Sequence, residues 1–187
     1  MKALFQQYKP VLFFLLRFLG SYVLLSLLYG GYLQYAQTDA FSPDAITQLV
    51  AQQSEALLKG VGYDAAIIPN VGHPSIQLWI SGKVVGHLVE GCNAVSIIIL
   101  FIAFVLAFAQ GWKKTLLFLL AGGVLIYAMN LVRIAILSVA LYNYPEYEHS
   151  LHTVVFPGII YGMVFLLWII WVRLLQTKKP IGDAADN

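Results

Sequence analysis

LVEGCNAVSIIILFIAFVLAFAQGW, residues 88–112, is the stretch on which the interpretation of this chain depends. It holds the chain's only cysteine, Cys92, beside Glu90 and Asn93, and no charged residue follows until Lys113. A run of about 20 apolar residues is long enough to cross the hydrocarbon core of a bilayer as a helix. The stretch therefore predicts a membrane helix with a thiol near its N-terminal end.

The rest of the chain has the composition of a membrane protein. Of its 187 residues, 60% are hydrophobic and only 11% are charged, whereas soluble domains carry about 25% charged residues. We expect no cleaved signal peptide, because the first apolar run is long and no clear small-residue cleavage site follows it. A single cysteine cannot form an intrachain disulfide, so Cys92 is a packing residue, an intermolecular link or a reactive thiol.

Four apolar runs are long enough to span a bilayer, and they predict an all-α membrane protein built as a bundle of four transmembrane helices. The runs are Val11–Leu33, roughly Val89–Ala109, Thr115–Leu141 and Thr153–Val172. Basic residues gather at the N-terminal end, between the second and third runs, and after the fourth run. These residues are Lys2, Lys9, Arg17, Lys113, Lys114, Arg173, Lys178 and Lys179. The positive-inside rule then predicts that both termini are cytoplasmic.

The segment 34–88 is predicted to be a small α+β cap on the extracytoplasmic side. Ser42-Pro43-Asp44 is a typical helix start, and the helix is expected to run to Lys59 and end at Gly60. The sequences IQLWI and KVVGHLV flank Ser81-Gly82, which favours a β-hairpin. We therefore divide the chain into segment 1–33 with the first span, the cap 34–88, a membrane core 89–176, and a disordered cytoplasmic tail 177–187.

Three chemically reactive side chains are predicted to lie at a similar depth on three different helices. At about 1.5 Å per residue, Cys92 lies about 26 Å, Arg133 about 27 Å and His152 about 30 Å from the cytoplasmic ends of their runs. All three would then lie near the outer edge of the hydrocarbon. The sequence permits these side chains to meet but does not require it.

Each of the three residues also has an ordinary structural explanation. A lone cysteine in a membrane helix is commonly a packing residue, and a histidine at a helix start is commonly an interfacial polar tip. Arg133 is harder to explain in this way, because an arginine within a span costs about 2.5–3.5 kcal/mol on insertion scales. It could snorkel outward, but Asn130 lies on the same helix face, and together they form a polar stripe that favours an inward orientation.

A thiol, a histidine and an arginine in one place would suit acyl transfer through a thioester. A nearby cation stabilises the nucleophilic thiolate, and a histidine can take up a proton and return it to a leaving amine. A fixed guanidinium can stabilise the oxyanion of the tetrahedral intermediate.

At these residues the sequence resembles the exosortase/archaeosortase family, and its short length resembles the short Bacteroidetes-type exosortases (the F-type group). The resemblance rests on Cys92 in EGCNAVS, Arg133 in NLVR with Asn130, and His152 in LHTVVFPGIIYG. It runs from about Val85 to Val172. Many members have a small hydroxyl residue and a glycine after the cysteine, whereas Asn93-Ala94 follows here. The role of Asn93 is therefore open.

The resemblance implies a membrane-embedded cysteine transpeptidase that needs no metal or cofactor. Such an enzyme would cleave the C-terminal tripartite sorting signal of exported proteins at the periplasmic face of a bacterial inner (plasma) membrane. It would transfer them to an amine-bearing surface lipid or glycan. Its other expected partners are membrane lipids, and no nucleic acid partner is expected. Cys92 would be the nucleophile, His152 the proton donor and Arg133 the oxyanion or substrate ligand. Asn130, Glu90 and Asn93 would support them, with Glu90 orienting His152 or Arg133, or capping the helix start.

Two other functions remain open from the sequence. A metal site is conceivable because several potential zinc ligands are expected at or outside the outer edge of the membrane. These are His73, His87, Glu90, Cys92, His149 and His152. A non-enzymatic export scaffold, with the cap as its binding module, is the other alternative. His149 is also a second candidate for the proton donor, although its polar neighbours favour a solvated surface position.

Overall fold

A computed structural model describes residues 2–36, 43–70, 72–109 and 111–176 of the chain. Within these ranges, the side chains of residues 2–7, 10, 148, 152, 156, 175 and 176 are not described. The predicted tail, 177–187, lies outside the described residues.

Three helices are long and apolar enough to cross a membrane, and they match three of the four predicted spans. They are α1 (Lys2–Ala36), α4 (Trp112–Asn143) and α6 (Phe156–Gln176). Their candidate spanning parts are Val11–Ala36, Trp112–Asn143 and Thr153–Leu174, the last beginning in the turn before α6. These three predictions are confirmed in length and composition.

The second predicted span is wrong in its bounds. Helix α3 covers only Val95–Ala107, 13 residues, or about 20 Å at 1.5 Å per residue, against the roughly 30 Å of a bilayer core. A 3₁₀ turn, η1 (Glu90–Cys92), precedes it, and Ala94 adopts the left-handed conformation with φ 63°. A residue in this conformation interrupts the right-handed helix, so α3 cannot extend back to Val89. Cys92 therefore lies in a turn before the helix.

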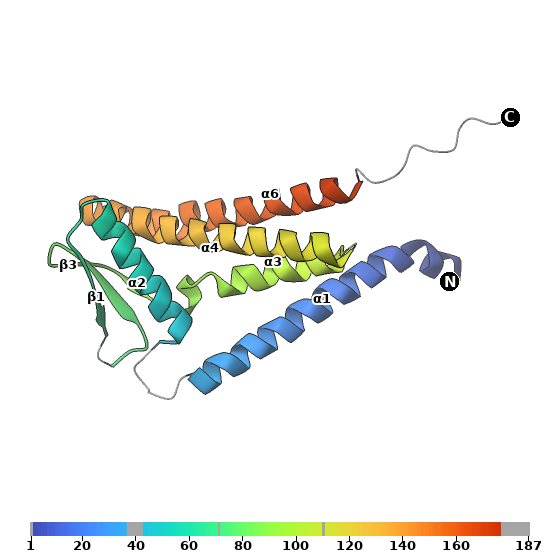
Figure 1. The fold of residues 1–187 in the computed structure, drawn as a ribbon, viewed down its shortest axis with the longest axis horizontal. Coiled ribbons are helices and arrows are strands. Elements are labelled where there is room, and N and C mark those ends of the chain that lie inside the picture. Colours follow the sequence, from blue (N-terminus) through green and yellow to red (C-terminus); the bar gives the residue numbers. More distant parts are fainter. Residues whose placement is uncertain (1, 37–42, 71, 110, 177–187) are drawn as a thin grey trace.

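The helices place the chain's basic ends together. The start of α1, the start of α4 and the end of α6 lie at one end of the molecule, and α2 and the β-sheet lie at the other (Figure 1). Lys113 and Lys114 are in the first turn of α4, and Arg173 is in the last turn of α6. This arrangement is the one that the positive-inside rule requires if this end faces the cytoplasm.

Between α1 and α3 the chain forms helix α2 (Ala45–Gly60) and the strands β1 (Ala65–Pro69), β2 (Ile76–Ile80) and β3 (Lys83–Leu88). The sheet is antiparallel in the order β1-β2-β3. The helix and the β2–β3 hairpin match the sequence prediction, whereas β1 was not predicted. Asp44 caps α2, because its carboxylate accepts from the backbone N–H groups of Ile46 and Thr47.

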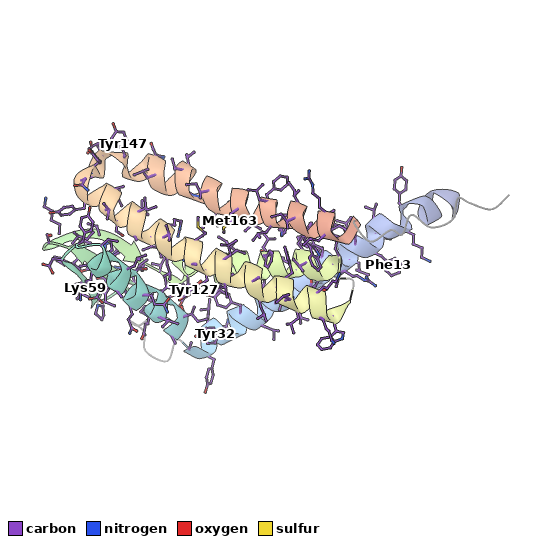
Figure 2. The ribbon with its side chains drawn as sticks, turned by 45° about the horizontal axis from the view of Figure 1, so that its top comes forward. Phe13, Tyr32, Lys59, Tyr127, Tyr147 and Met163 are labelled. Atoms are coloured by element: carbon purple, nitrogen blue, oxygen red, sulfur yellow. The ribbon has the colours of Figure 1, made fainter. Side chains whose placement is uncertain are left out.

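Two hydrophobic cores hold the molecule together. The first joins α2, the sheet and the C-terminal half of α4 through Leu58, Leu78, Ile80 and Ile134. Tyr127 adds a polar tie between α4 and α2, since its hydroxyl donates to Gln53 Oε1 at 2.7 Å (Figure 2).

The second core joins α3, α4 and α6 around the fully buried ring of Phe101. Phe118 of α4 stacks on Trp171 of α6 with ring centroids 4.7 Å apart, and Phe104 of α3 stacks on Trp168 at 4.3 Å. Helix α1 packs on α3 through Phe14, whose ring centroid lies 4.5 Å from that of Phe108. Aromatic contacts of this kind supply packing that a bilayer cannot provide by hydrophobic exclusion.

Helix α3 packs closely on α4 at Gly122, where a Cβ atom would clash with the Phe101 ring. We predict that Gly122→Ala lowers the stability of the protein by about 1–3 kcal/mol, because the enclosed ring has little room to shift. Gly123→Ala is the matched control, since nothing lies within 4 Å of its Cβ position. Thermal melting in detergent micelles checks this, and equal melting temperatures for the two variants would contradict the close contact.

Candidate active site

A pocket of about 200 Å³ lies between strand β3 and helix α4, and both Cys92 and Arg133 line it. Its walls are otherwise mainly apolar. They are formed by Leu78, Val85 and Leu88 of the sheet and by Ile134, Leu137 and Leu141 of α4. A thiol and a guanidinium, borne by segments about 40 residues apart in sequence, thus share one small cavity.

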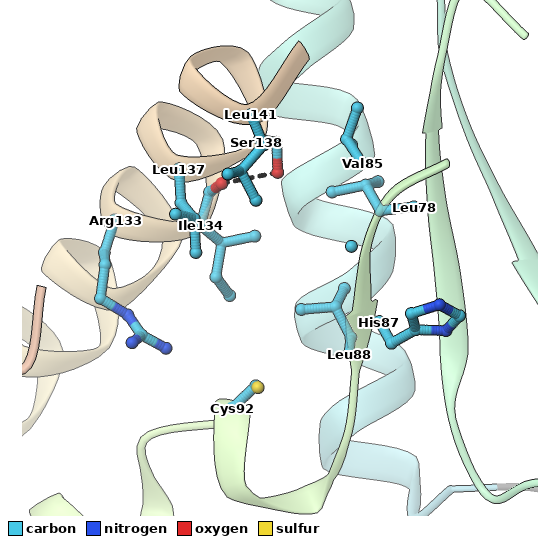
Figure 3. A pocket seen from close by; sticks show the side chains of 11 residues that line it. Leu78, Val85, His87, Leu88, Cys92, Arg133, Ile134, Leu137, Ser138 and Leu141 are labelled. Carbon is cyan, nitrogen blue, oxygen red and sulfur yellow. Dashed lines mark hydrogen bonds between the residues drawn. The ribbon is translucent and has the colours of Figure 1, made fainter. Parts of the chain in front are cut away.

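The two reactive side chains extend into the same pocket. Figure 3 shows the guanidinium of Arg133 directed from α4 toward the cavity into which the Cys92 sulfur also points. Cys92 is partly exposed and forms no disulfide. Arg133 Nε is buried without a hydrogen-bond partner, and no carboxylate in the described part of the chain forms an ion pair with Arg133. A buried unsatisfied donor is costly, so the guanidinium is available for a ligand that accepts hydrogen bonds.

Asn130 fixes the turn that carries Cys92. Its amide Nδ2 donates to the backbone oxygen of Cys92 at 2.8 Å, and its side chain is only 1% exposed. Asn130 and Arg133 are three residues apart on α4 and so lie on neighbouring positions of one helix face. The same helix therefore holds the backbone of the cysteine and presents the guanidinium to its side chain.

Asn93 does not line the pocket but belongs to a buried polar cluster, the Asn93 clamp, formed by Tyr29, Asp44, Thr47 and Asn93. Asn93 Nδ2 donates to the Tyr29 hydroxyl at 2.8 Å and to Thr47 Oγ1 at 3.1 Å. Thr47 Oγ1 in turn donates to Asp44 Oδ1. The clamp joins α1, the start of α2 and the residue after Cys92, so Asn93 does not supply a hydrogen bond inside the pocket.

Asn93 also performs the capping role that we considered for Glu90. Its Oδ1 accepts from the backbone N–H of Val95 at 3.0 Å, at the start of α3. Glu90 lies one turn earlier, in η1, and is partly exposed. The sequence did not predict that α3 begins after Asn93, so Asn93 was not considered for this role.

The two candidate proton donors lie just before α6. His152 belongs to a π-helical turn, η3 (Leu151–Val155), and its side chain lies outside the described part of the structure. His149 belongs to the short helix α5 (Glu148–Ser150) and is exposed. Widened turns of this kind are frequent at functional sites.

The metal alternative finds no support in the described residues. None of their His, Cys, Asp and Glu side chains form a group of three or more that could hold a metal ion. The imidazole of His87 is exposed and points to the side of β3 away from Cys92 (Figure 3). A tetrahedral zinc site would need three or four such ligands to converge.

Helices of membrane-spanning length and a pocket shared by a thiol and a guanidinium define a membrane protein with a candidate cysteine-based site. The chain matches the family model described as Transmembrane exosortase (Exosortase_EpsH) over residues 10–172. It therefore belongs to the transmembrane exosortase family, which is in general a family of cysteine transpeptidases. No curated protein and no solved structure gave a match.

Sequence reasoning missed most of the Asn93 clamp and the part of the pocket formed by β3. Asp44 was recognised only as part of a helix start, although a hydroxyl at Thr47, three residues later, is a common companion of a capping carboxylate. Tyr29 carried no local signal, because its partner Asn93 is 64 residues away. Only the tertiary structure could connect them.

The Asn93 clamp predicts a measurable coupling between α1 and the turn that carries Cys92. Asn93→Ala should lower stability by about 1–3 kcal/mol, because it leaves the buried hydroxyls of Tyr29 and Thr47 without a donor. Tyr29→Phe should cost less, and the double variant should be less destabilised than the sum of the two. Thermal melting of all four proteins closes the cycle, and strict additivity would argue against the hydrogen bond.

Proposed function

We propose that this protein is a membrane-embedded cysteine transpeptidase that cleaves C-terminal sorting signals of exported proteins through a thioester at Cys92. The observation that carries the proposal is the shared pocket, which both the only thiol of the chain and the guanidinium of Arg133 line. Membership of the exosortase family supports the reaction class. The substrate, the acceptor and the roles of individual residues are parts of the proposal.

The proposed reaction proceeds in two acyl-transfer steps. The Cys92 thiolate attacks the scissile carbonyl carbon, and the tetrahedral intermediate collapses as the C–N bond breaks. The departing amine leaves with the proton donated by a general acid, and the acyl group remains as a thioester. An amine on a surface lipid or glycan then attacks the thioester and regenerates the thiol. Water would give plain hydrolysis by the same route.

Arg133 acts on the negative charge that develops during both steps. Its guanidinium lines the same pocket as the thiol, has a free buried donor and is surrounded mainly by apolar side chains. Hydrogen bonds to an oxyanion are stronger in such a poorly solvated site than in water. Asn130 keeps the geometry constant by holding the carbonyl of Cys92.

His152 is the proposed proton donor. It lies in the turn that leads into α6. Helix α6 packs against α4, which carries Arg133, and against α3, which follows the turn with Cys92. An imidazole is suited to protonate an amine at neutral pH.

The apolar part of the sorting signal is proposed to pack along α6. Gly158 and Gly162 are exposed, and no atom of the described structure lies within 4 Å of their Cβ positions. Among the described residues, these glycines therefore do not serve packing between helices. A small-xxx-small face permits close approach of a second membrane helix. A signal helix held there in the bilayer would lead toward the turn before α6.

Comparison of membrane proteomes tests the proposed reaction in cells. In cells that produce Cys92→Ala, we expect exported precursors with an apolar C-terminal span and a basic tail to accumulate uncut, because the nucleophilic thiol is gone. Cys92→Ser should lose nearly all processing, since an alcohol is a far weaker nucleophile than a thiolate. Normal processing in both variants would favour the non-enzymatic scaffold instead.

A second test examines Arg133 without requiring the substrate. Because Cys92 is the only thiol, the rate of alkylation by iodoacetamide, followed by intact mass, reports on this residue alone. Arg133→Gln should slow alkylation at neutral pH about tenfold, because the charge that stabilises the thiolate is removed. Arg17→Gln is the matched control, since Arg17 is exposed on α1 and does not line the pocket. Equal rates in the two variants would refute the role of Arg133.

A further inference from the structure

The pocket beside Cys92 depends on one residue of strand β3 that lacks a side chain. Gly86 pairs with Leu78 of β2, and residues directly opposite in an antiparallel sheet point to the same face. Leu78 is buried in the core that includes Ile134 of α4. A side chain at position 86 would therefore point from the sheet toward α4.

Open space occupies the position where that side chain would be. No heavy atom lies within 4 Å of the Cβ position of Gly86, although the neighbouring strand residues Val85 and Leu88 are buried. The backbone of Gly86 does not adopt a positive φ, so the conformation itself does not require a glycine. Glycine in a strand commonly marks close approach of another backbone or a ligand.

A β-bulge at the same place adds to this feature. Trp79 pairs with Val84 and Leu78 pairs with Gly86, which leaves Val85 without a partner on β2. Bulges redirect side chains and are over-represented next to active sites. Here the bulge brings both Val85 and Gly86 to the pocket.

The chemistry of the pocket selects an apolar group. Leu78, Val85, Leu88, Ile134, Leu137 and Leu141 form most of the wall. Ser138 and His87 also line it. The Ser138 hydroxyl already donates to the backbone oxygen of Ile134 at 2.7 Å, and the His87 imidazole is exposed and points away from Cys92 (Figure 3). The charged Arg133 and the thiol lie at the base. A volume of about 200 Å³ exceeds the roughly 150 Å³ of an apolar cavity that binds benzene.

We propose that Gly86 keeps open a specificity subsite for a branched aliphatic side chain of the substrate, on the residue whose carbonyl Cys92 attacks. That side chain is the one closest to the attacked carbon, so it enters the cavity that adjoins the sulfur. The inference rests on the proposed function of Cys92. It adds the side-chain class that the enzyme accepts and the residue that determines it.

Acetyl-amino-acid chloromethyl ketones test the subsite with the full-length protein in detergent micelles. The Cys92 sulfur displaces chloride from the chloromethyl carbon, so an S–C bond forms and a C–Cl bond breaks. The side chain next to the ketone then occupies the proposed subsite. Reagents built on glycine, valine, leucine and aspartate are compared by the rate at which they label Cys92, followed by intact mass. The wild-type protein should react at least about tenfold faster with the valine and leucine reagents than with the glycine or aspartate reagents.

Gly86→Val fills the cavity with a residue that strands favour. In this variant the rates with the valine and leucine reagents should fall to the rate with the glycine reagent, so that the preference disappears. Gly86→Ala should show an intermediate loss of preference, and it serves as the test if Gly86→Val fails to fold. Lys83→Val is the matched control, because it places the same side chain on the same strand at an exposed residue that does not line the pocket. It should retain the wild-type preference.

The outcomes separate the two proposals. If iodoacetamide labels Cys92 with the expected Arg133 dependence but the wild-type protein reacts equally with all four reagents, the subsite proposal is wrong and the proposed function stands. An unchanged preference in a folded Gly86→Val protein also overturns the subsite proposal. If Cys92 reacts slowly with every reagent and Arg133 has no effect, the proposed function itself fails.

Discussion

The hydrogen bond from Asn130 Nδ2 to the carbonyl oxygen of Cys92 ties the turn that carries the thiol to helix α4. Cys92 lies in a short 3₁₀ turn that is followed by Asn93 and the left-handed residue Ala94, and such a turn has few internal hydrogen bonds of its own. Helix α4 is long and regular, so it supplies a rigid reference. Because Arg133 is on the same helix, fixing the turn also fixes the distance between thiol and guanidinium.

The polar groups around this turn form hydrogen bonds with one another rather than with water. Asn93 and Asn130 are each 1% exposed, and Asp44 and Thr47 are also buried. Their donors and acceptors find partners across α1, α2, α3 and α4. Burial makes an unpaired polar group costly, so the cluster specifies one arrangement of these segments. Arg133 Nε is the exception in this neighbourhood, which is consistent with a group reserved for a ligand.

Much of the architecture was predictable because it depends on local hydrophobicity. Three spanning helices, α2 and the β2–β3 hairpin follow from run lengths, a helix start at Asp44 and a turn at Ser81-Gly82. The second span was predicted too long, because the prediction joined residues 89–94, which include Glu90 and Asn93, to the apolar run that follows them. Hydropathy does not register the left-handed conformation of Ala94, which ends the helix on that side.

The sequence by itself determined that this is a membrane protein of the exosortase type, because apolar run lengths and the order of Cys92, Arg133 and His152 are properties of the linear chain. Only the tertiary structure decided which residues share the pocket and which direction Asn93 and His87 face. It also assigned the open wall of the pocket to Gly86. The physical reason is that side-chain direction and cavity shape arise from packing between segments distant in sequence, and no local pattern encodes them.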